Sequence, residues 1–272
     1  MVWFGHSSLF IQISGKKILV DPVFSKYASP VPFTNKAFKG TNIYDVDDLP
    51  EIDILLITHD HYDHLDYPTI KKLKDKVSKV IVPLGVDAHL LRWGYDEDKI
   101  TTVDWDDEVV IDDNLKICAL EARHFSGRSF FNRNQSLWVS YLIEEKINNK
   151  NYKLFLSGDG GYSGRFKEFK ERFGKIDLAA MESGQYNKEW SLIHSKPEDV
   201  LMASQDMEVE NLLPIHNSKF KLSNHTWDDP LKRLDELTKN TNIKLLTPII
   251  GEKIYLHKEN SFSKWWENIE NK

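Results

Sequence analysis

The sequence has a single cysteine and no long apolar run, and each absence removes a class of protein. Cys118 is the only cysteine among 272 residues, so no disulfide can form within the chain. It lies in the apolar run 115–120, which favours a buried, unreactive thiol over a nucleophile. No apolar run approaches the ~18 residues that a membrane-spanning helix requires. We therefore expect neither a disulfide framework nor stable membrane insertion.

Positive charge is also scarce, with 36 Lys and Arg against 42 Asp and Glu and a net charge of −6. A nucleic-acid-binding protein usually carries a basic excess, so we expect no nucleic-acid partner. The chain opens with neither a basic segment nor a long apolar stretch, so we expect no signal peptide and a cytoplasmic location. The sequence leaves open whether the protein forms a homo-oligomer.

The pattern of apolar runs predicts a mixed α/β protein. Strands are expected at residues 8–13, 17–20, 52–58, 79–83, 100–103, 108–111, 115–122, 138–143, 153–156, 176–181, 211–215, 244–250 and 253–256. Helices are expected at residues 67–76, 86–93, 163–173, 197–207 and 228–239. A long loop at 24–44 has the length of a functional cover, and 148–151 is a polar turn. Strands outnumber the helices between them, which predicts two packed sheets with helices outside, in one domain spanning residues 1–272.

A dense run of histidine and aspartate residues directly follows the apolar strand 52–58. His59, His61, Asp63 and His64 occupy positions one, three, five and six of a six-residue window. Imidazole and carboxylate groups together suit zinc, iron or manganese. A solvated histidine-rich loop is the alternative. The metal site is favoured because the end of a buried strand is where α/β proteins position ligands.

Three further candidates also follow apolar strands: His124, Asp159 and His216. Four ligands from one loop cannot fill two metal sites, so other strand ends must supply the rest. Taken singly, His124 suits a cap or the surface, Asp159 a turn, and His216 a half-buried position. Taken together with the dense loop, the three indicate a shared metal centre at one edge of the sheets.

This recurrence resembles the metallo-β-lactamase superfamily, in which a His-x-His-x-Asp-His loop precedes a histidine, a bridging aspartate and a last histidine. Within it, the chain is similar to the branch that contains N-acyl-phosphatidylethanolamine-hydrolysing phospholipase D and L-ascorbate-6-phosphate lactonase. The similarity extends from residue 2 to about residue 256 and is carried by segments 3–8, 19–24, 29–30, 158–162 and 214–216. Segment 217–220 departs from the branch, since it reads Asn-Ser-Lys-Phe where relatives often carry Trp-Gly-Thr-Phe. The rim of the pocket is therefore expected to differ.

The resemblance implies an α/β, four-layer αββα sandwich with a dinuclear metal centre. The implied ligands are His59, His61 and His124 at one site and Asp63, His64 and His216 at the other, with Asp159 bridging both. The expected cofactors are two divalent ions, zinc first, with manganese or iron as alternatives. Such a pair activates a shared water as the nucleophile, and Asp63 and Asp159 are accordingly expected to be catalytic as well as ligating.

Protonation of the leaving group requires a further donor, for which His194 and His225 are the candidates. For both, a structural role is an equal alternative, and at His225 that role is helix capping. His6 is expected to be a buried, hydrogen-bonded histidine and not a ligand. Asp21 and Asp66 could accept hydrogen bonds from metal-bound imidazoles.

Five cations in or near predicted loops could bind a phosphate, although solvation at the surface is the simpler role for each: Lys36, Lys39, Arg128, Arg133 and Lys219. The predicted function is a metal-dependent hydrolase that attacks a phosphodiester, phospholipase D-like or small. A lactonase or other carbonyl hydrolase acting on a sugar phosphate is the alternative, and a non-catalytic, metal-stabilised binding protein is an alternative of another class. The expected partner is a small-molecule or lipid-like substrate.

Overall fold

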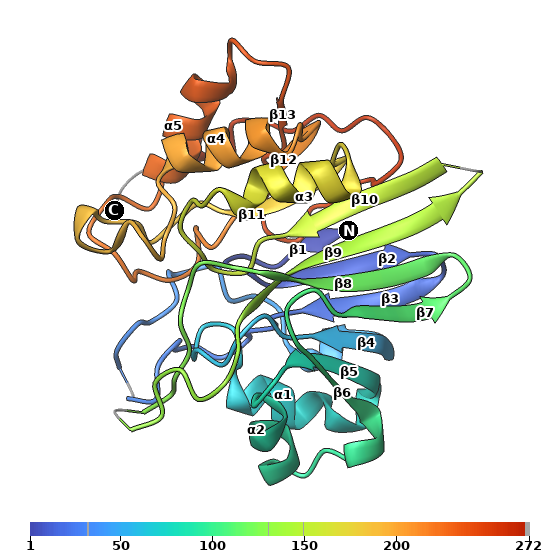
Figure 1. The fold of residues 1–272 in the computed structure, drawn as a ribbon. Helices are drawn as coiled ribbons and strands as arrows, with labels where there is room; N and C mark the ends of the chain where they lie inside the picture. Colours follow the sequence, from blue (N-terminus) through green and yellow to red (C-terminus); the bar gives the residue numbers. More distant parts are fainter. Residues whose placement is uncertain (32, 130, 149, 270–272) are drawn as a thin grey trace.

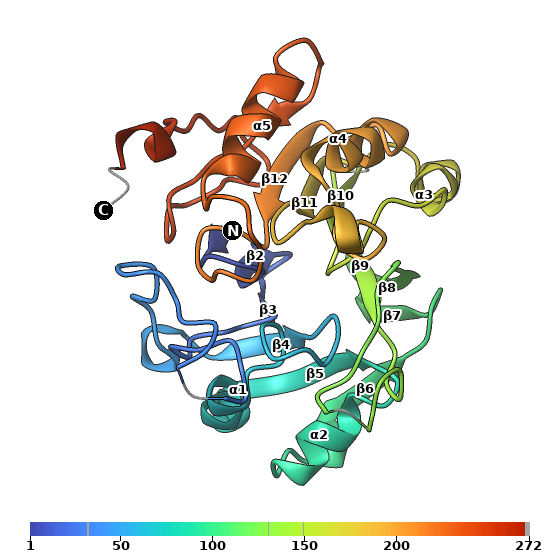
Figure 2. The same ribbon diagram turned by 90° about the vertical axis from the view of Figure 1, so that its left-hand side faces the viewer.

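The computed structural model describes residues 1–31, 33–129, 131–148 and 150–269. Two sheets stack face to face, and helices cover the outer face of each, giving the predicted four-layer αββα sandwich (Figure 1). In Figure 2, α1 and α2 flank one sheet, and α3, α4 and α5 flank the other. Among the described residues, no helix is long and apolar enough to cross a membrane.

The first sheet holds six strands in sequence order. They are β1 (Val2–Trp3), β2 (Leu9–Ile13), β3 (Lys16–Val20), β4 (Ile52–Leu56), β5 (Val77–Pro83) and β6 (Ile100–Val103). The strands from β3 to β6 run parallel, because helical crossovers connect β4 to β5 and β5 to β6. The crossovers contain α1 (Tyr67–Leu73) and α2 (Asp87–Arg92).

The second sheet holds seven strands in the order β13-β12-β11-β10-β9-β8-β7. They are β7 (Glu108–Asp112), β8 (Leu115–Glu121), β9 (Val139–Ile147), β10 (Lys150–Leu156), β11 (Leu178–Glu182), β12 (Asn211–Ile215) and β13 (Lys244–Leu245). Strands β10 to β13 are parallel and alternate with α3 (Arg165–Phe173), α4 (Pro197–Asp206) and α5 (Asp229–Thr238). The remaining strands are antiparallel.

The apolar runs of the central strands reflect burial on both faces. In β4, Ile54 and Leu56 join the core between the sheets, whereas Ile52 and Leu55 pack in the layer beneath α1 and α2. This alternation explains why residues 52–58 read as a near-continuous apolar segment. A strand held on both faces is rigid, so the residues that follow it are aimed reproducibly.

The predicted strand pair at 244–250 and 253–256 is wrong. Strand β13 ends at Leu245, and residue 248 is a proline, which cannot donate to a ladder. The chain instead crosses to the first sheet, where Lys253 bridges to Val2. The predicted polar turn at 148–151 is also shortened, because Lys150 already pairs with Ile147; residue 149 lies outside the described residues.

Two isolated bridges hold the long loop at 24–44, one from Tyr27 to Lys36 and one from Ala37 to Phe220. Residue 32 of this loop lies outside the described residues. The second bridge ties the loop to the segment after β12. Here Lys219 is buried, with 1% exposure, and its Nζ donates to the carbonyls of Val23 at 2.8 Å and Phe4 at 3.3 Å. Lys219 therefore braces the loop and has no access to a phosphate.

Burial lowers the pKa of Lys219 to about 8 from the ordinary 10.5. Between these values the unfolded chain binds more protons than the folded one, so this lysine makes stability rise with pH across that window. A shift of this size corresponds to roughly 3 kcal/mol at most. We expect the Lys219→Met variant to lack this rise when its urea-unfolding free energy is compared with that of the wild type from pH 7 to 10.5. Lys39→Met is the exposed control, and parallel curves for Lys219→Met and wild type would contradict the assignment.

Candidate metal centre

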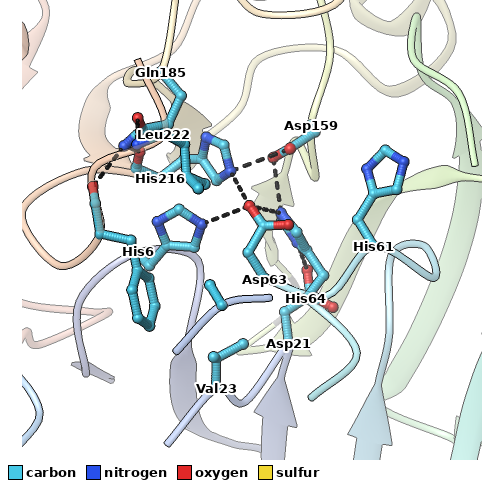
Figure 3. Close-up of polar contacts among 12 residues, drawn as sticks. His6, Asp21, Val23, His61, Asp63, His64, Asp159, Gln185, His216 and Leu222 are labelled. Atoms are coloured by element: carbon cyan, nitrogen blue, oxygen red, sulfur yellow. Dashed lines mark hydrogen bonds and ion pairs between the residues drawn. The ribbon is translucent and has the colours of Figure 1, made fainter. Parts of the chain in front are cut away.

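Four loops that follow strands converge at one edge of the sandwich. Segment 59–64 follows β4, His124 follows β8, Asp159 follows β10, and His216 follows β12. All seven predicted ligand side chains lie in this region, in overlapping groups whose ligand atoms are within 4.8 Å of one another. Figure 3 shows Asp63, His64, Asp159 and His216 pointing toward a common centre.

One group consists of three imidazoles. His61 Nδ1 lies 2.9 Å from His59 Nε2 and 3.1 Å from His124 Nε2. Burial lowers the pKa of all three rings, so the neutral, ligating form is favoured.

The second group combines carboxylate and imidazole. Asp63 Oδ2 lies 3.2 Å from His216 Nε2 and 3.9 Å from His64 Nε2. Asp159 faces both groups: its Oδ1 is 3.1 Å from His64, and its Oδ2 is 3.1 Å from His216 and 3.8 Å from His124. The Asp159 carboxylate is thus placed between the two sets of donors.

The outer partners of the rings fix which nitrogen faces inward. His64 Nδ1 donates to Asp21 Oδ2 at 2.8 Å, and His124 Nδ1 donates to the carbonyl of Ile193 at 3.0 Å. The Thr58 hydroxyl donates to Asp21 at 2.6 Å, so it accepts from His59 Nδ1 at 3.0 Å. In each ring the Nε2 lone pair is therefore left pointing at the centre, as in protein metal sites.

The nitrogen and oxygen atoms that face one another at the centre have too few hydrogens to pair all of them by hydrogen bonds. Whether a cation fits the site can be judged from the atoms left unpaired. In the three-imidazole group, the central His61 Nδ1 can donate to only one of its two neighbours. His64 Nε2 and Asp159 Oδ1 are buried and lie 3.1 Å apart without hydrogen-bond geometry, and neither has another hydrogen-bond partner among the described residues. Buried polar atoms are rarely left unpaired, so the donor set fits divalent cations.

Backbone geometry around the centre is tightly constrained. Gly158, which precedes Asp159, has a φ of +59°, and a Cβ there would lie 2.7 Å from the carbonyl of Val139. Asp21, with a φ of +40°, and His216, with a φ of +64°, hold left-handed conformations without being glycine. Such strain persists where the surrounding structure imposes it, commonly at functional sites.

His6 joins the centre more closely than its sequence context indicated. It is fully buried and hydrogen-bonded, as expected, but its partner is Asp63 Oδ2, 3.0 Å from His6 Nε2. Its ring lies 4.1 Å from that of His216, centroid to centroid. His6 lies in the turn between β1 and β2, and its position beside Gly5 was the only local signal.

Glu182 was missed by the sequence analysis. It ends β11 and accepts from His194 Nδ1 at 2.7 Å and from the backbone N–H of Gly160 at 2.7 Å. Burial opposes protonation of His194, but the Glu182 and Asp159 carboxylates prevail and raise the pKa of His194 to about 9. The sequence did contain one signal for Glu182. It is a charged residue at the end of an apolar strand, and the neighbouring strands are followed by candidate ligands.

Two other residues differ from their expected places. The His225 ring stacks on Tyr186 at 4.2 Å, and its Nδ1 lies 2.8 Å from the Thr226 carbonyl, so the structure does not bring it to the centre. Asp66 accepts from Thr69 and from the Ser25 N–H and contacts none of the described imidazoles.

Arg128 clasps the loop that carries four of the predicted ligands. Its Nη1 donates to the carbonyls of Asp60 and Leu65, each at 2.7 Å, and its guanidinium lies 4.0 Å from the Tyr62 ring centroid. The Tyr62 hydroxyl donates back to the Arg128 carbonyl at 2.8 Å. Lys36, Lys39 and Arg133 remain on the surface.

A cavity of about 350 Å³ opens over the centre. Its floor contains His61, Asp63, Asp159, His194 and His216. Its walls are largely apolar and are formed by Phe125, Trp190, Ile193 and Leu222, with the amide of Gln185. The site thus brings together candidate cation ligands, a histidine whose pKa is raised and a cavity with largely apolar walls, an arrangement suited to a metal-dependent hydrolase.

Comparison with known proteins agrees with this class. Residues 16–217 match the family described as the beta-lactamase superfamily domain, and the chain belongs to that superfamily. An uncharacterised protein of Mycobacterium tuberculosis is 34% identical, covering 97% of this chain and 70% of its own. The mitochondrial N-acyl-phosphatidylethanolamine-hydrolysing phospholipase D of Saccharomyces cerevisiae is 34% identical over 86% of this chain and 51% of its own length.

The fold is shared with solved structures. An isothiocyanate hydrolase from Delia radicum gut bacteria superimposes with a TM-score of 0.68 at 19% identity, covering 92% of this chain and 97% of that one. The resemblance seen in the sequence is confirmed, and the chain is a metal-dependent hydrolase of the metallo-β-lactamase fold.

The Arg128 clasp should control metal affinity. We expect Arg128→Met to keep the fold but weaken metal binding about tenfold, as loss of an outer partner of a metal site typically does. Titration of the metal-free protein with Zn²⁺, followed calorimetrically, measures this. Arg133→Met is the matched control, because Arg133 is exposed and stacks on Phe125 outside the clasp. Equal affinities in Arg128→Met and wild type would show that the clasp is dispensable.

Proposed function

We propose that this protein hydrolyses a phosphodiester of lipid-like character at a dinuclear metal centre. The main support for this proposal is the position of Asp159. Its two carboxylate oxygens face two separate donor groups at the floor of a cavity with apolar walls. His59, His61 and His124 would hold one ion, Asp63, His64 and His216 the other, and Asp159 both. Because imidazoles dominate this set, zinc is the proposed metal, with manganese or iron as alternatives.

When bound, such a pair of ions supplies an activated water and neutralises charge on an anionic substrate. The protein's own groups provide the rest of the chemistry. His6 fixes the Asp63 carboxylate, and Asp21 orients His64 through its outer nitrogen. These contacts hold the donors in place before substrate arrives, which limits reorganisation during the reaction.

His194 is the proposed proton donor for the leaving group. It lines the cavity, and its Nδ1 is held by Glu182, so Nε2 is the nitrogen left for the substrate. Its raised pKa keeps it protonated at neutral pH. A general acid must carry its proton when the leaving oxygen departs, and His194 meets that condition. His225 lies outside this cavity and is therefore not placed to donate to the same leaving group.

The walls favour a lipid-like phosphodiester over a sugar-phosphate lactone. Four large apolar side chains surround the floor, and acyl chains would cover more of this apolar surface than a hydroxyl-rich sugar would. The yeast relative whose name specifies phospholipid hydrolysis aligns over 86% of this chain, which supports the same choice. The lactonase remains the second candidate, because ions held by the same donors would supply the Lewis acid that polarises a carbonyl.

Loss of the proposed bridging carboxylate should remove both metal and turnover. We expect the purified wild type to bind about two ions per chain and to hydrolyse bis(4-nitrophenyl) phosphate. Asp159→Ala should retain fewer ions and lose about 100-fold or more of its turnover. Elemental analysis and the release of nitrophenol measure the two effects, with Asp112→Ala on the distant strand β7 as control. Full metal content and turnover in Asp159→Ala would exclude the bridging role.

The apolar walls should set the preference for substrates with long chains. We expect Trp190→Ala and Leu222→Ala to raise KM for a phosphodiester bearing an octyl chain more than for its methyl counterpart. Each truncation removes apolar contact worth roughly 1–3 kcal/mol, or about 5- to 100-fold in that ratio. Steady-state kinetics with both esters provides the measurement. If the octyl-to-methyl ratio is unchanged in both variants, the lipid-like substrate class is wrong.

A further inference from the structure

A second cavity, of about 300 Å³, lies beside the first and shares one wall residue with it, Gln185. The segment after β12 separates the two cavities. Leu222 lines the metal cavity, whereas its neighbours Lys221 and Ser223 line the second one. Phe38, from the long loop 24–44, closes another side. Because Gln185 lines both cavities, a substrate group that extends over this residue would lie against the lining of the second cavity.

The lining of the second cavity mixes polar and aromatic side chains and contains no acidic side chain among the described residues. It combines one lysine, one histidine, three hydroxyl groups and three amides with three aromatic rings. This is unusual for a chain in which acidic residues outnumber basic ones, 42 to 36. Such a lining disfavours a cationic ligand and suits an anionic one.

Two donors in the cavity are free to bind a ligand. The hydroxyls of Ser218 and Ser223 are already used, since they donate to Asn217 and to the Tyr186 carbonyl at 2.7 Å each. By contrast, the exposed side chains of Lys221 and Asn224 make no hydrogen bond or ion pair with any described residue. An ammonium and an amide group remain, and both are good donors to oxyanions.

The frame of the cavity is rigid. Gln185 is buried; its Nε2 donates to the Phe220 carbonyl at 3.1 Å, and its Oε1 accepts from the Leu222 N–H at 2.8 Å. Gln185 and Ser218 both have left-handed backbones, with φ values of +60° and +62°. The bridge from Ala37 to Phe220 holds the outer loop against the same segment. The two free donors are thus carried by a fixed wall.

We propose that this second cavity is a subsite for an additional anionic group of the substrate, a phosphate monoester or a carboxylate remote from the bond that is cleaved. Lys221 and Asn224 bind that group, and Gln185 sets its position relative to the metal centre. This subsite rests on the proposed phosphodiesterase function and extends it, because it specifies a substrate with two anionic groups. It also accounts for a segment after His216 that differs from the branch pattern.

The test compares phosphodiesters that share a 4-nitrophenyl leaving group, assayed with the metal-loaded enzyme. Bis(4-nitrophenyl) phosphate has no second anion, and two further esters carry a phosphate monoester or a carboxylate on the other alcohol. Lys221→Ala and the isosteric Asn224→Asp should raise KM for the anion-bearing esters about tenfold more than for the plain ester, with little change in kcat. Lys150→Ala, on the distant β9–β10 hairpin, removes the same charge and should leave this KM ratio as in the wild type.

A larger effect with the phosphate ester identifies phosphate as the ligand, and a larger effect with the carboxylate ester identifies a carboxylate. Identical KM ratios in the wild type and both variants would overturn the subsite. If the plain ester is not hydrolysed, the proposed function fails, and calorimetric titration with inorganic phosphate decides the subsite separately. Weaker phosphate binding by Lys221→Ala than by wild type would then support it, and equal binding would refute it.

Discussion

The convergence of buried carboxylates and imidazoles on one small volume is the constraint on which this structure depends. Taking ionised carboxylates out of water is costly unless positive charge compensates them. Without a cation, burial opposes protonation of His64, yet Asp159 and Asp21 raise its pKa well above the ordinary value. The space between His64 and Asp159 therefore attracts positive charge. A divalent ion bound there can supply that charge in place of the proton on His64. This electrostatic demand explains why so many donors tolerate burial.

The sandwich makes that convergence mechanically possible. Strands β4 and β12, from different sheets, are buried on their faces and position candidate ligands directly. His59 lies three residues after the end of β4, and His216 comes immediately after β12. Left-handed conformations at His6, Asp21 and His216 show that the turns are held against local preference. The packing of two sheets, and not loop flexibility, sets the positions of the donors.

The sequence predicted the features that are marked by a cluster of residues or a periodic apolar pattern. It missed residues whose role depends on a single contact with a distant part of the chain. The loop 59–64 and the residues after strands were visible, because apolar runs mark strand ends and ligands follow them. Glu182 was missed, since one acidic residue after an apolar run carries no weight alone. Lys219 was read as a surface cation because its burial arises from carbonyls of Phe4 and Val23, more than 190 residues away along the chain. The predicted pairing of 244–250 with 253–256 failed similarly, since residues 244–245 pair with β12 and Lys253 bridges to Val2 in the first sheet.

In the proposed arrangement, the metal cavity holds the reacting group of the substrate, and the second cavity binds a remote group that determines substrate choice. His216 closes the metal centre, and the residues directly after it build the partition between the cavities, so a substitution there can alter substrate choice while sparing the donors. Lys219 illustrates this division: it is three residues from His216, yet it lines neither cavity, and its ammonium group donates to the carbonyls of Val23 and Phe4. Lys221, two residues further along, lines the second cavity. Because Gln185 Nε2 donates to the carbonyls of both His216 and Phe220, one buried amide links the last candidate ligand to the segment that lines the proposed subsite, and it fixes the distance between them.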